Sequence, residues 1–159
     1  MRLKKFKTFT FVATLFLFVV SCGSGKNPYF FEDDLTTVPE PFSTAGITPI
    51  VQDDGLKVYV LKEGSGPYTV TNRDDVLVFY TGRRANGKVF DSSYKNGSQS
   101  ASQLSVNGVI DGFRQGLLGM KEGGKKVLVI PPDLGYGNSG HTLSKDTLIF
   151  DIELSMIVK

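Results

Sequence analysis

The stretch from Val76 to Leu154 contains few residues that could do chemistry, and most of its distinctive residues are aromatic or aliphatic. It has one histidine, His141, and no cysteine, and none of its side chains cluster with the spacing of a metal site. The distinctive residues fall in four short signatures, FYTG (79–82), GKVFDSS (87–93), VIDGFRQGL (109–117) and GYG…GH (135–141).

Strands must position most of these residues. The segment 76–81 is a nearly continuous apolar run, which is typical of a central strand buried on both sides, and Asn86-Gly87 supplies a tight turn after it. The final strand is the clearest, because apolar residues alternate from Leu148 to Val158, with Met156 among those expected to face inward. The pattern predicts strands at 56–60, 76–81, 88–91, 103–106, 125–130 and 148–158.

One segment predicts a helix. It starts at Asp111, which we expect to cap it, and its apolar residues Phe113, Leu117 and Leu118 fall on one face. Its glycines give it poor intrinsic propensity, so tertiary packing must hold it. Together these elements predict an α+β fold, in which an antiparallel sheet curls over one short helix.

The four signatures occur in a fixed order and are followed by TLIFDIEL (147–154). This ordered set resembles the FKBP-type peptidyl-prolyl cis-trans isomerases over roughly residues 55–159. The resemblance implies an FKBP-like curved antiparallel β-sheet wrapped around one short α-helix. It also implies an enzyme that acts on X-Pro bonds of polypeptides and uses no cofactor or metal.

The chemistry of that reaction suits an apolar site. Rotation about an X-Pro bond breaks amide resonance, at a cost of about 18–20 kcal/mol. The twisted amide loses charge separation, so an apolar pocket favours it over the planar ground state. A few placed donors can hold the carbonyls that flank the proline.

The resemblance implies that Tyr80, Asp91, Ile110 and Tyr136 are the catalytic residues. The Ile110 N–H and the Tyr136 hydroxyl would donate to substrate carbonyls, and the Asp91 carboxylate would polarise the bound imide from the pocket edge. Taken alone, Tyr80 could be a core residue and Asp91 a turn residue, but the ordered motifs favour the site. The residues expected to bind the substrate are Phe90, Leu104, Val109, Phe113, His141, Leu143 and Phe150.

The chain departs from the family pattern at three places. It has no tryptophan, and Phe113 takes the position of the tryptophan at the pocket floor. Leu104 stands where a phenylalanine is common. In the loop that overhangs the site, Leu143 replaces an isoleucine, and the segment 142–146 lacks the two prolines that usually follow it. We expect this loop to pre-organise the site less, which would lower turnover or the affinity for macrolide-type ligands.

The N-terminus predicts an exported lipoprotein. A basic start leads into an apolar run, 8–20, that is too short to span a bilayer, which needs about 20 residues, and so predicts a signal peptide over 1–21. The only cysteine, Cys22, ends a lipobox-like VVSC and would be acylated, with palmitate among its chains, to anchor the protein in the membrane. The alternative is an ordinary signal peptide cut near Ser21.

Residues 22–54 are predicted to be a lipidated N-terminus and a tether, ahead of an isomerase domain at 55–159. The tether contains Gly23-Ser24-Gly25 and scattered prolines, which favour an irregular chain. Its aromatic residues do not suit a pure spacer. They indicate either a strap that packs on the domain or an element that docks a partner.

Composition and charge bound the function. At 159 residues the chain has room for one domain and an appendage. Of 18 Lys and Arg residues, four lie in the predicted signal peptide, which leaves 14 against 16 acidic residues and gives no reason to expect nucleic acid as a partner. The leading hypothesis is a monomeric, lipid-anchored isomerase that assists folding of exported proteins at a bacterial cell envelope. The alternative is a weakly active or inactive binding module of the same fold in a membrane-anchored assembly.

Overall fold

The computed structural model describes residues 32–137 and 139–158, of which those from Asp33 onward form one compact unit. The predicted signal peptide, Cys22 and the first part of the predicted tether, up to residue 31, lie outside the described residues. Within the described part of the chain, no helix is long and apolar enough to cross a membrane.

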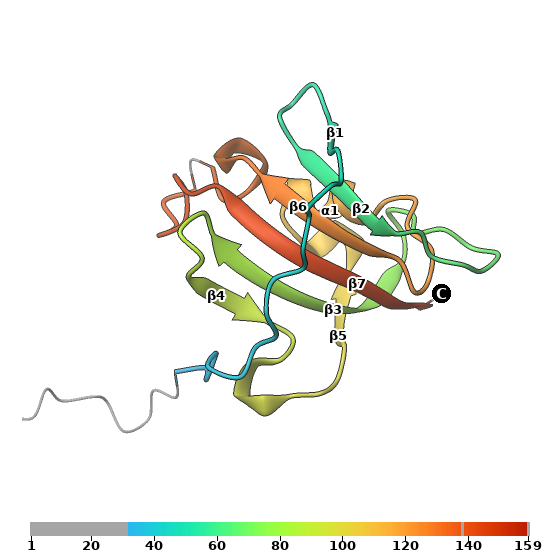
Figure 1. The fold of residues 1–159 in the computed structure, drawn as a ribbon, viewed down its shortest axis with the longest axis horizontal. Helices are drawn as coiled ribbons and strands as arrows, with labels where there is room; N and C mark the ends of the chain where they lie inside the picture. Colours follow the sequence, from blue (N-terminus) through green and yellow to red (C-terminus); the bar gives the residue numbers. More distant parts are fainter. Residues whose placement is uncertain (1–31, 138, 159) are drawn as a thin grey trace, which may run out of the picture. The chain divides into compact units, whose positions relative to one another are not determined.

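The unit is built on one antiparallel sheet (Figure 1). Its strands lie in the order β1-β2-β6-β7-β3-β4, and β5 pairs with the first half of β3 on the side where β4 pairs with the second half. The sheet confirms the predicted strands, and its α+β class is as predicted. The strands are β1 (Ile50–Val51), β2 (Lys57–Lys62), β3 (Asp75–Arg84), β4 (Val89–Ser92), β5 (Ser102–Ser105), β6 (Lys125–Ile130) and β7 (Leu148–Val158).

The helix α1 (Asp111–Leu117) packs on the inner face of the sheet, against β6. Its two buried glycines, Gly112 and Gly116, allow the close approach, because a Cβ at either position would overlap Ile130 or Leu128. The predicted cap is wrong by one residue. Ile110 is the N-cap, and Asp111 instead accepts hydrogen bonds from the Arg114 guanidinium within the first turn. Three short 3-10 turns complete the unit, η1 (Lys95–Gly97), η2 (Val106–Gly108) and η3 (Pro132–Leu134).

The core lies between α1 and the sheet, and β7 contributes its inward residues from Leu148 to Leu154. The alternation expected of this strand ends after Leu154. At that point a bulge shifts the register between the two strands, so that Val78 of β3 faces Leu154 but Leu77 faces Met156. Beyond the bulge Ile157 is buried and Met156 is half exposed. The expectation that Met156 faces inward is therefore wrong.

Residues 33–51, which we call the strap, cross the outer face of the sheet, on the side away from α1 (Figure 1). Arg83 of β3 and Asp151 of β7 point to this face and pair with each other, and both are buried. The strap holds the pair, because Arg83 donates to the Pro39 carbonyl at 2.6 Å and the Phe42 N–H donates to Asp151. Burial raises the pKa of Asp151, and Arg83 opposes that shift. The strap ends in β1, which pairs with β2.

Candidate functional site

A cavity of about 250 Å³ opens on the inner side of the sheet. Its walls come from β3, β4, β5, β7, α1 and the segments that precede α1 and follow β6, so residues far apart in the sequence meet there. Eight of the residues expected in the site line it, and the sequence analysis missed only Gly108, at the end of η2. The lining residues are Tyr80, Asp91, Leu104, Gly108, Val109, Ile110, Phe113, Tyr136 and Phe150.

Aromatic rings packed edge to face form the apolar part of the cavity. The Phe113 and Phe150 centroids lie 5.0 Å apart at an interplanar angle of 83°, and the ring of Tyr80 meets Phe113 at 5.9 Å and 82°. Phe90 does not line the cavity, but it supports Phe150 at 5.5 Å and 90°. Gly82 leaves room for this packing, since a Cβ there would lie 2.7 Å from both Phe150 and Phe90. The glycine of FYTG is thus a packing requirement, which its spacing alone does not reveal.

Tyr80 and Asp91 form the polar edge of the cavity. The Tyr80 hydroxyl donates to Asp91 Oδ2 at 2.7 Å, and the Ser92 N–H donates to Asp91 Oδ1 at 2.9 Å. The serines of DSS fix β4 against β3, because the Tyr80 N–H donates to Ser93 Oγ and Ser92 Oγ donates to the Tyr80 carbonyl. Burial and the Asp91 carboxylate raise the pKa of Tyr80, so its hydroxyl remains a donor.

Tyr136 closes the cavity from the segment after β6, and its ring stacks on that of His141 with centroids 4.0 Å apart at 14°. Burial, followed by the nearby Asp91 charge, raises the pKa of Tyr136. His141 and Leu143 do not line the cavity. His141 Nδ1 accepts from the Leu143 N–H at 3.1 Å, which places the Leu143 side chain in the core at 4% exposure. Leu143 is linked to the cavity through the loop, whereas His141 also contacts it indirectly by stacking on the lining residue Tyr136.

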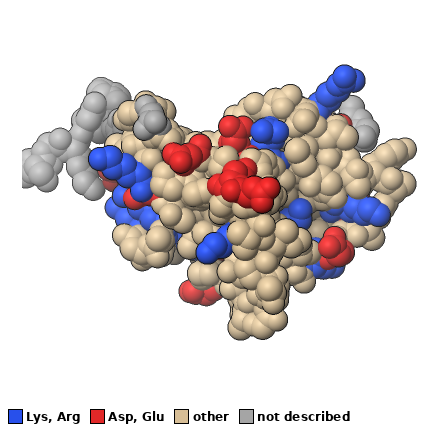
Figure 2. All heavy atoms as spheres, turned by 90° about the horizontal axis from the view of Figure 1, so that it is seen from above, with Lys and Arg blue, Asp and Glu red and all other residues tan. Residues whose placement is uncertain are grey.

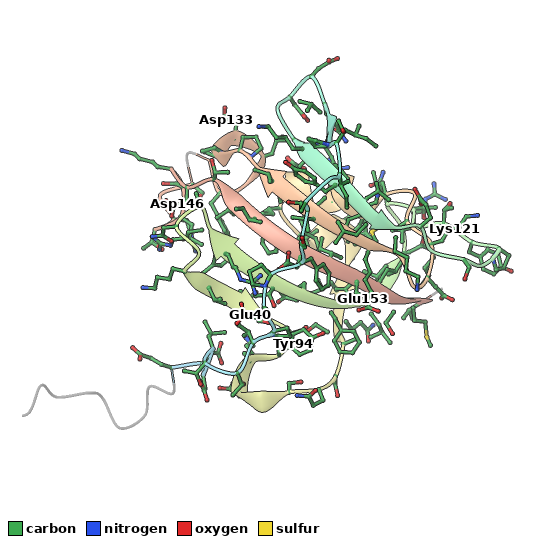
Figure 3. The ribbon with its side chains drawn as sticks, in the orientation of Figure 1. Glu40, Tyr94, Lys121, Asp133, Asp146 and Glu153 are labelled. Carbon is green, nitrogen blue, oxygen red and sulfur yellow. The ribbon has the colours of Figure 1, made fainter. Side chains whose placement is uncertain are left out.

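The loop between Ser139 and Thr147 lacks the two prolines of the family but has other anchors. Turns close through the Ser144 N–H to the His141 carbonyl and the Asp146 N–H to the Leu143 carbonyl, each at 3.0 Å. Asp146, which Figure 3 labels, also pairs with Arg84 at the end of β3, at 3.3 Å. With Leu143 buried beneath it, this loop is joined to the sheet at its middle and at its end.

The remaining surface carries mixed charge. Acidic and basic side chains are interspersed over the face seen in Figure 2. Among residues 32–137 and 139–158, no three His, Cys, Asp or Glu side chains are grouped so that they could hold a metal ion. The residues that line the cavity supply aromatic surface, two tyrosine hydroxyls, main-chain groups and one carboxylate.

Comparison with known proteins agrees with this geometry. The family model for FKBP-type peptidyl-prolyl cis-trans isomerases matches residues 66–155. The chain is 43% identical over 108 residues to FK506-binding protein 1A of Neurospora crassa, covering 66% of this chain and 90% of the relative. It is 42% identical over 104 residues to the peptidyl-prolyl cis-trans isomerase Mip of Chlamydia muridarum, covering 65% of this chain but only 42% of Mip.

Among solved structures, the crystal structure of FkpA from Escherichia coli superposes with a TM-score of 0.63 at 37% identity. The match covers 69% of this chain and 51% of that one. The match thus spans less than half the length of Mip, about half of the crystallised FkpA chain and 37% of full-length Escherichia coli FkpA. The family model matches more than half of this chain's length. This chain therefore belongs to the FKBP-type peptidyl-prolyl cis-trans isomerase family and has the FKBP fold.

Proposed function

We propose that this chain catalyses the cis-trans isomerisation of X-Pro bonds in polypeptides. The observation that carries the proposal is the cavity itself, where three aromatic rings, Tyr80, Phe113 and Phe150, enclose an apolar space bordered by the Tyr80–Asp91 hydrogen bond. A proline ring fits such a space, and an apolar residue before the proline would contact Leu104 and Val109 at its rim. A macrolide-type ligand would compete for the same space.

The proposed mechanism is stabilisation of the twisted amide. In the planar state the amide carries charge separation, which the aromatic walls solvate poorly, whereas the twisted state has lost most of it. The Ile110 N–H and the Tyr136 hydroxyl would hold the carbonyls that flank the proline, and so keep the chain still while the bond rotates. Because the Tyr80 hydroxyl is already bound to Asp91, its part is to fix that carboxylate at the edge of the cavity.

Two substitutions test the site. Asp91→Ala combined with Tyr136→Phe removes both polar groups, and we expect kcat/KM for a short Xaa-Pro peptide to fall by at least about tenfold. Tyr59→Phe and Asp53→Ala, which lie outside the cavity, are the matched controls and should retain wild-type turnover. If the double variant isomerised as fast as the wild type, the site assignment would be wrong. Folded wild type without activity would favour the binding module.

The location is a separate proposal. We propose that the mature protein is held at a bacterial cell envelope by lipid on Cys22 and acts there on exported proteins. The basic start, the short apolar run and the lone cysteine support this, as do bacterial relatives such as Mip and FkpA. Mass spectrometry of the mature N-terminus should find acylated Cys22, and Cys22→Ser should release the protein from membranes. An unmodified cysteine would contradict the anchor.

A further inference from the structure

The first residues of the strap contact η1, which follows β4 and its cavity residue Asp91. Lys95 Nζ lies 3.0 Å from Asp33 Oδ2, and the Asn96 side chain donates to Asp33 Oδ1 at 2.9 Å. Two further hydrogen bonds of 2.7 Å join Asp34 and Asn96, one from the Asn96 N–H to the Asp34 carbonyl and one from the Asp34 N–H to Asn96 Oδ1. These four contacts, which we call the latch, tie the strap to η1, 62 residues further along the chain.

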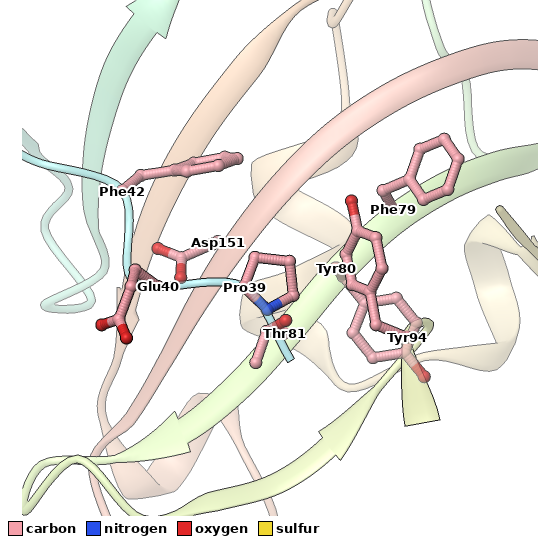
Figure 4. A pocket seen from close by; sticks show the side chains of 8 residues that line it. All are labelled: Pro39, Glu40, Phe42, Phe79, Tyr80, Thr81, Tyr94 and Asp151. Carbon is pink, nitrogen blue, oxygen red and sulfur yellow. The ribbon is translucent and has the colours of Figure 1, made fainter. Parts of the chain in front are cut away.

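The strap has little freedom to move away from η1, because it is fixed on the sheet a few residues later. Pro39 and Phe42 lie over Asp151 and Thr81, and a small cavity of about 20 Å³ between them extends to Phe79 and Tyr94 (Figure 4). Tyr94, which precedes η1, stacks on Phe79 at 5.4 Å. The latch is thus one end of a fixed segment.

The latch also determines where Lys95 lies. Asn96 has a left-handed backbone, with φ at 56°, and this bends η1 back toward the strap. Lys95 Nζ then stands between two carboxylates, 3.0 Å from Asp33 and 3.8 Å from Asp91. Hydrogen bonds from Lys95 and then Asn96 hold the pKa of Asp33 below its ordinary value of 3.8, which is itself far below neutral, so Asp33 is charged at neutral pH.

We propose that Asp33 and Lys95 are positioning residues for the isomerase site, through which the strap sets the charge beside Asp91. Asp33 holds the Lys95 ammonium near Asp91 Oδ1, while Asp91 Oδ2 accepts from Tyr80. The ammonium offsets the carboxylate charge and restrains η1, and both effects keep Asp91 oriented toward the cavity edge. The segment ahead of the isomerase domain therefore completes the site. This inference rests on the proposed function for its kinetic readout.

The test measures kcat and KM for an Xaa-Pro peptide in the full chain. Since the contacts are solvent-exposed, Asp33→Asn and Lys95→Met should each lower kcat/KM about two- to fivefold, and the double variant should be no worse than Lys95→Met alone. Asp33→Glu should recover part of the loss. Added salt should lower the wild-type value toward that of the variants and leave the variants unchanged. Asp53→Asn, an exposed carboxylate just after the strap, is the matched control.

A second readout does not depend on catalysis. In ¹H–¹⁵N NMR spectra, Asp33→Asn should shift the amide signals of Asp91 and Ser92 as well as those of η1, and Asp53→Asn should not. If Asp33→Asn left both kcat/KM and these signals as in the wild type, or if losses in the two single variants simply added, the latch would have no part in positioning. If the wild type were folded but inactive, the proposed function would fail, and the NMR shifts alone would decide the latch.

Discussion

At the scale of residues, the two tyrosines of the cavity have different tasks. The Tyr80 hydroxyl donates a hydrogen bond to Asp91 at 2.7 Å, and this bond restrains the rotation of the carboxylate. Tyr136 stacks on His141 and lines the cavity from the segment after β6. In the proposed mechanism Tyr136 is therefore the tyrosine that donates to a substrate, because the Tyr80 hydroxyl is already bound to Asp91.

The pKa shifts of these tyrosines make a testable statement about pH. Burial raises the pKa of both Tyr80 and Tyr136 above the ordinary tyrosine value of 10.0, so the protonated donors persist through that pH. We therefore expect kcat/KM to show no alkaline loss up to about pH 10. Peptide isomerisation measured across this range checks it. A loss centred near about pH 8 would mean that one hydroxyl ionises early, and would contradict the assignment of Tyr136 as a donor.

At the scale of elements, the glycines of α1 show that close packing against the sheet can outweigh helix propensity. A Cβ on Gly116 would overlap the Leu128 side chain, so the helix can lie close to β6 only with glycine there. Gly116→Ala should destabilise the unit by about 1–3 kcal/mol, although alanine forms helices better by about 1 kcal/mol. Urea unfolding measures this, with Gln115→Ala on the outer side of the helix as the control. A stabilised Gly116→Ala variant would show that the interface between α1 and β6 can accommodate the added methyl group.

The buried ion pair under the strap gives a second prediction. Arg83 and Asp151 are each only 7% exposed in their side chains, so Asp151→Ala leaves a buried guanidinium without its partner. The expected loss in the free energy of unfolding is about 3–5 kcal/mol, and limited proteolysis should cut the strap faster. The double variant Arg83→Met with Asp151→Leu removes both charges and should lose much less. Equal losses in the single and double variants would mean that packing, not charge, holds the strap.

The strands and the helix could be predicted from hydrophobic period and turn residues, because those features are local. The segment 125–130 matches β6, and the apolar residues from Leu148 mark β7. The bulge that turns Met156 outward was not predictable, since it depends on the register between β3 and β7. A strap was one of the two interpretations of the aromatic tether, but the residues that anchor it could not be predicted. Its anchors, Arg83 and Asp151, read as ordinary polar residues on the outward face of their strands.

In the candidate site, too, the parts set by local sequence could be predicted and the parts set by long-range contacts could not. The ordered motifs and the family resemblance that they carry pointed to eight of the residues that line the cavity, which lie on β3, β4, β5, β7, α1 and the segments beside them. Leu143 was expected to contact substrate but lies in the core, at 4% exposure. Its place is set by the His141 Nδ1 hydrogen bond and the turn that follows, a long-range arrangement that no local pattern specifies.

At the scale of the whole molecule, the compact unit begins at Asp33, ahead of the stretch that carries the family resemblance. A chain starting at Gly55 would lose the strap, and with it the cover over Asp151 and Thr81. We expect it to be at least about 2 kcal/mol less stable than the chain starting at Asp33, since it would lose the partly buried Phe42 and the strap's contacts with the buried Arg83–Asp151 pair. Thermal and urea unfolding of the two chains would measure the difference. Equal stability of the two chains would mean that the strap does not contribute to the stability of the unit and serves only as a spacer.

The central claim is that the aromatic cavity turns over X-Pro bonds, and NMR exchange spectroscopy tests it most directly. A peptide with an apolar residue before proline interconverts unaided over tens to hundreds of seconds, too slowly to give exchange peaks between its cis and trans signals. With catalytic amounts of the chain added, we predict clear cis-trans exchange peaks, which disappear when a macrolide-type ligand fills the cavity. Absence of exchange in the presence of folded protein would contradict the account and leave the cavity as a binding site.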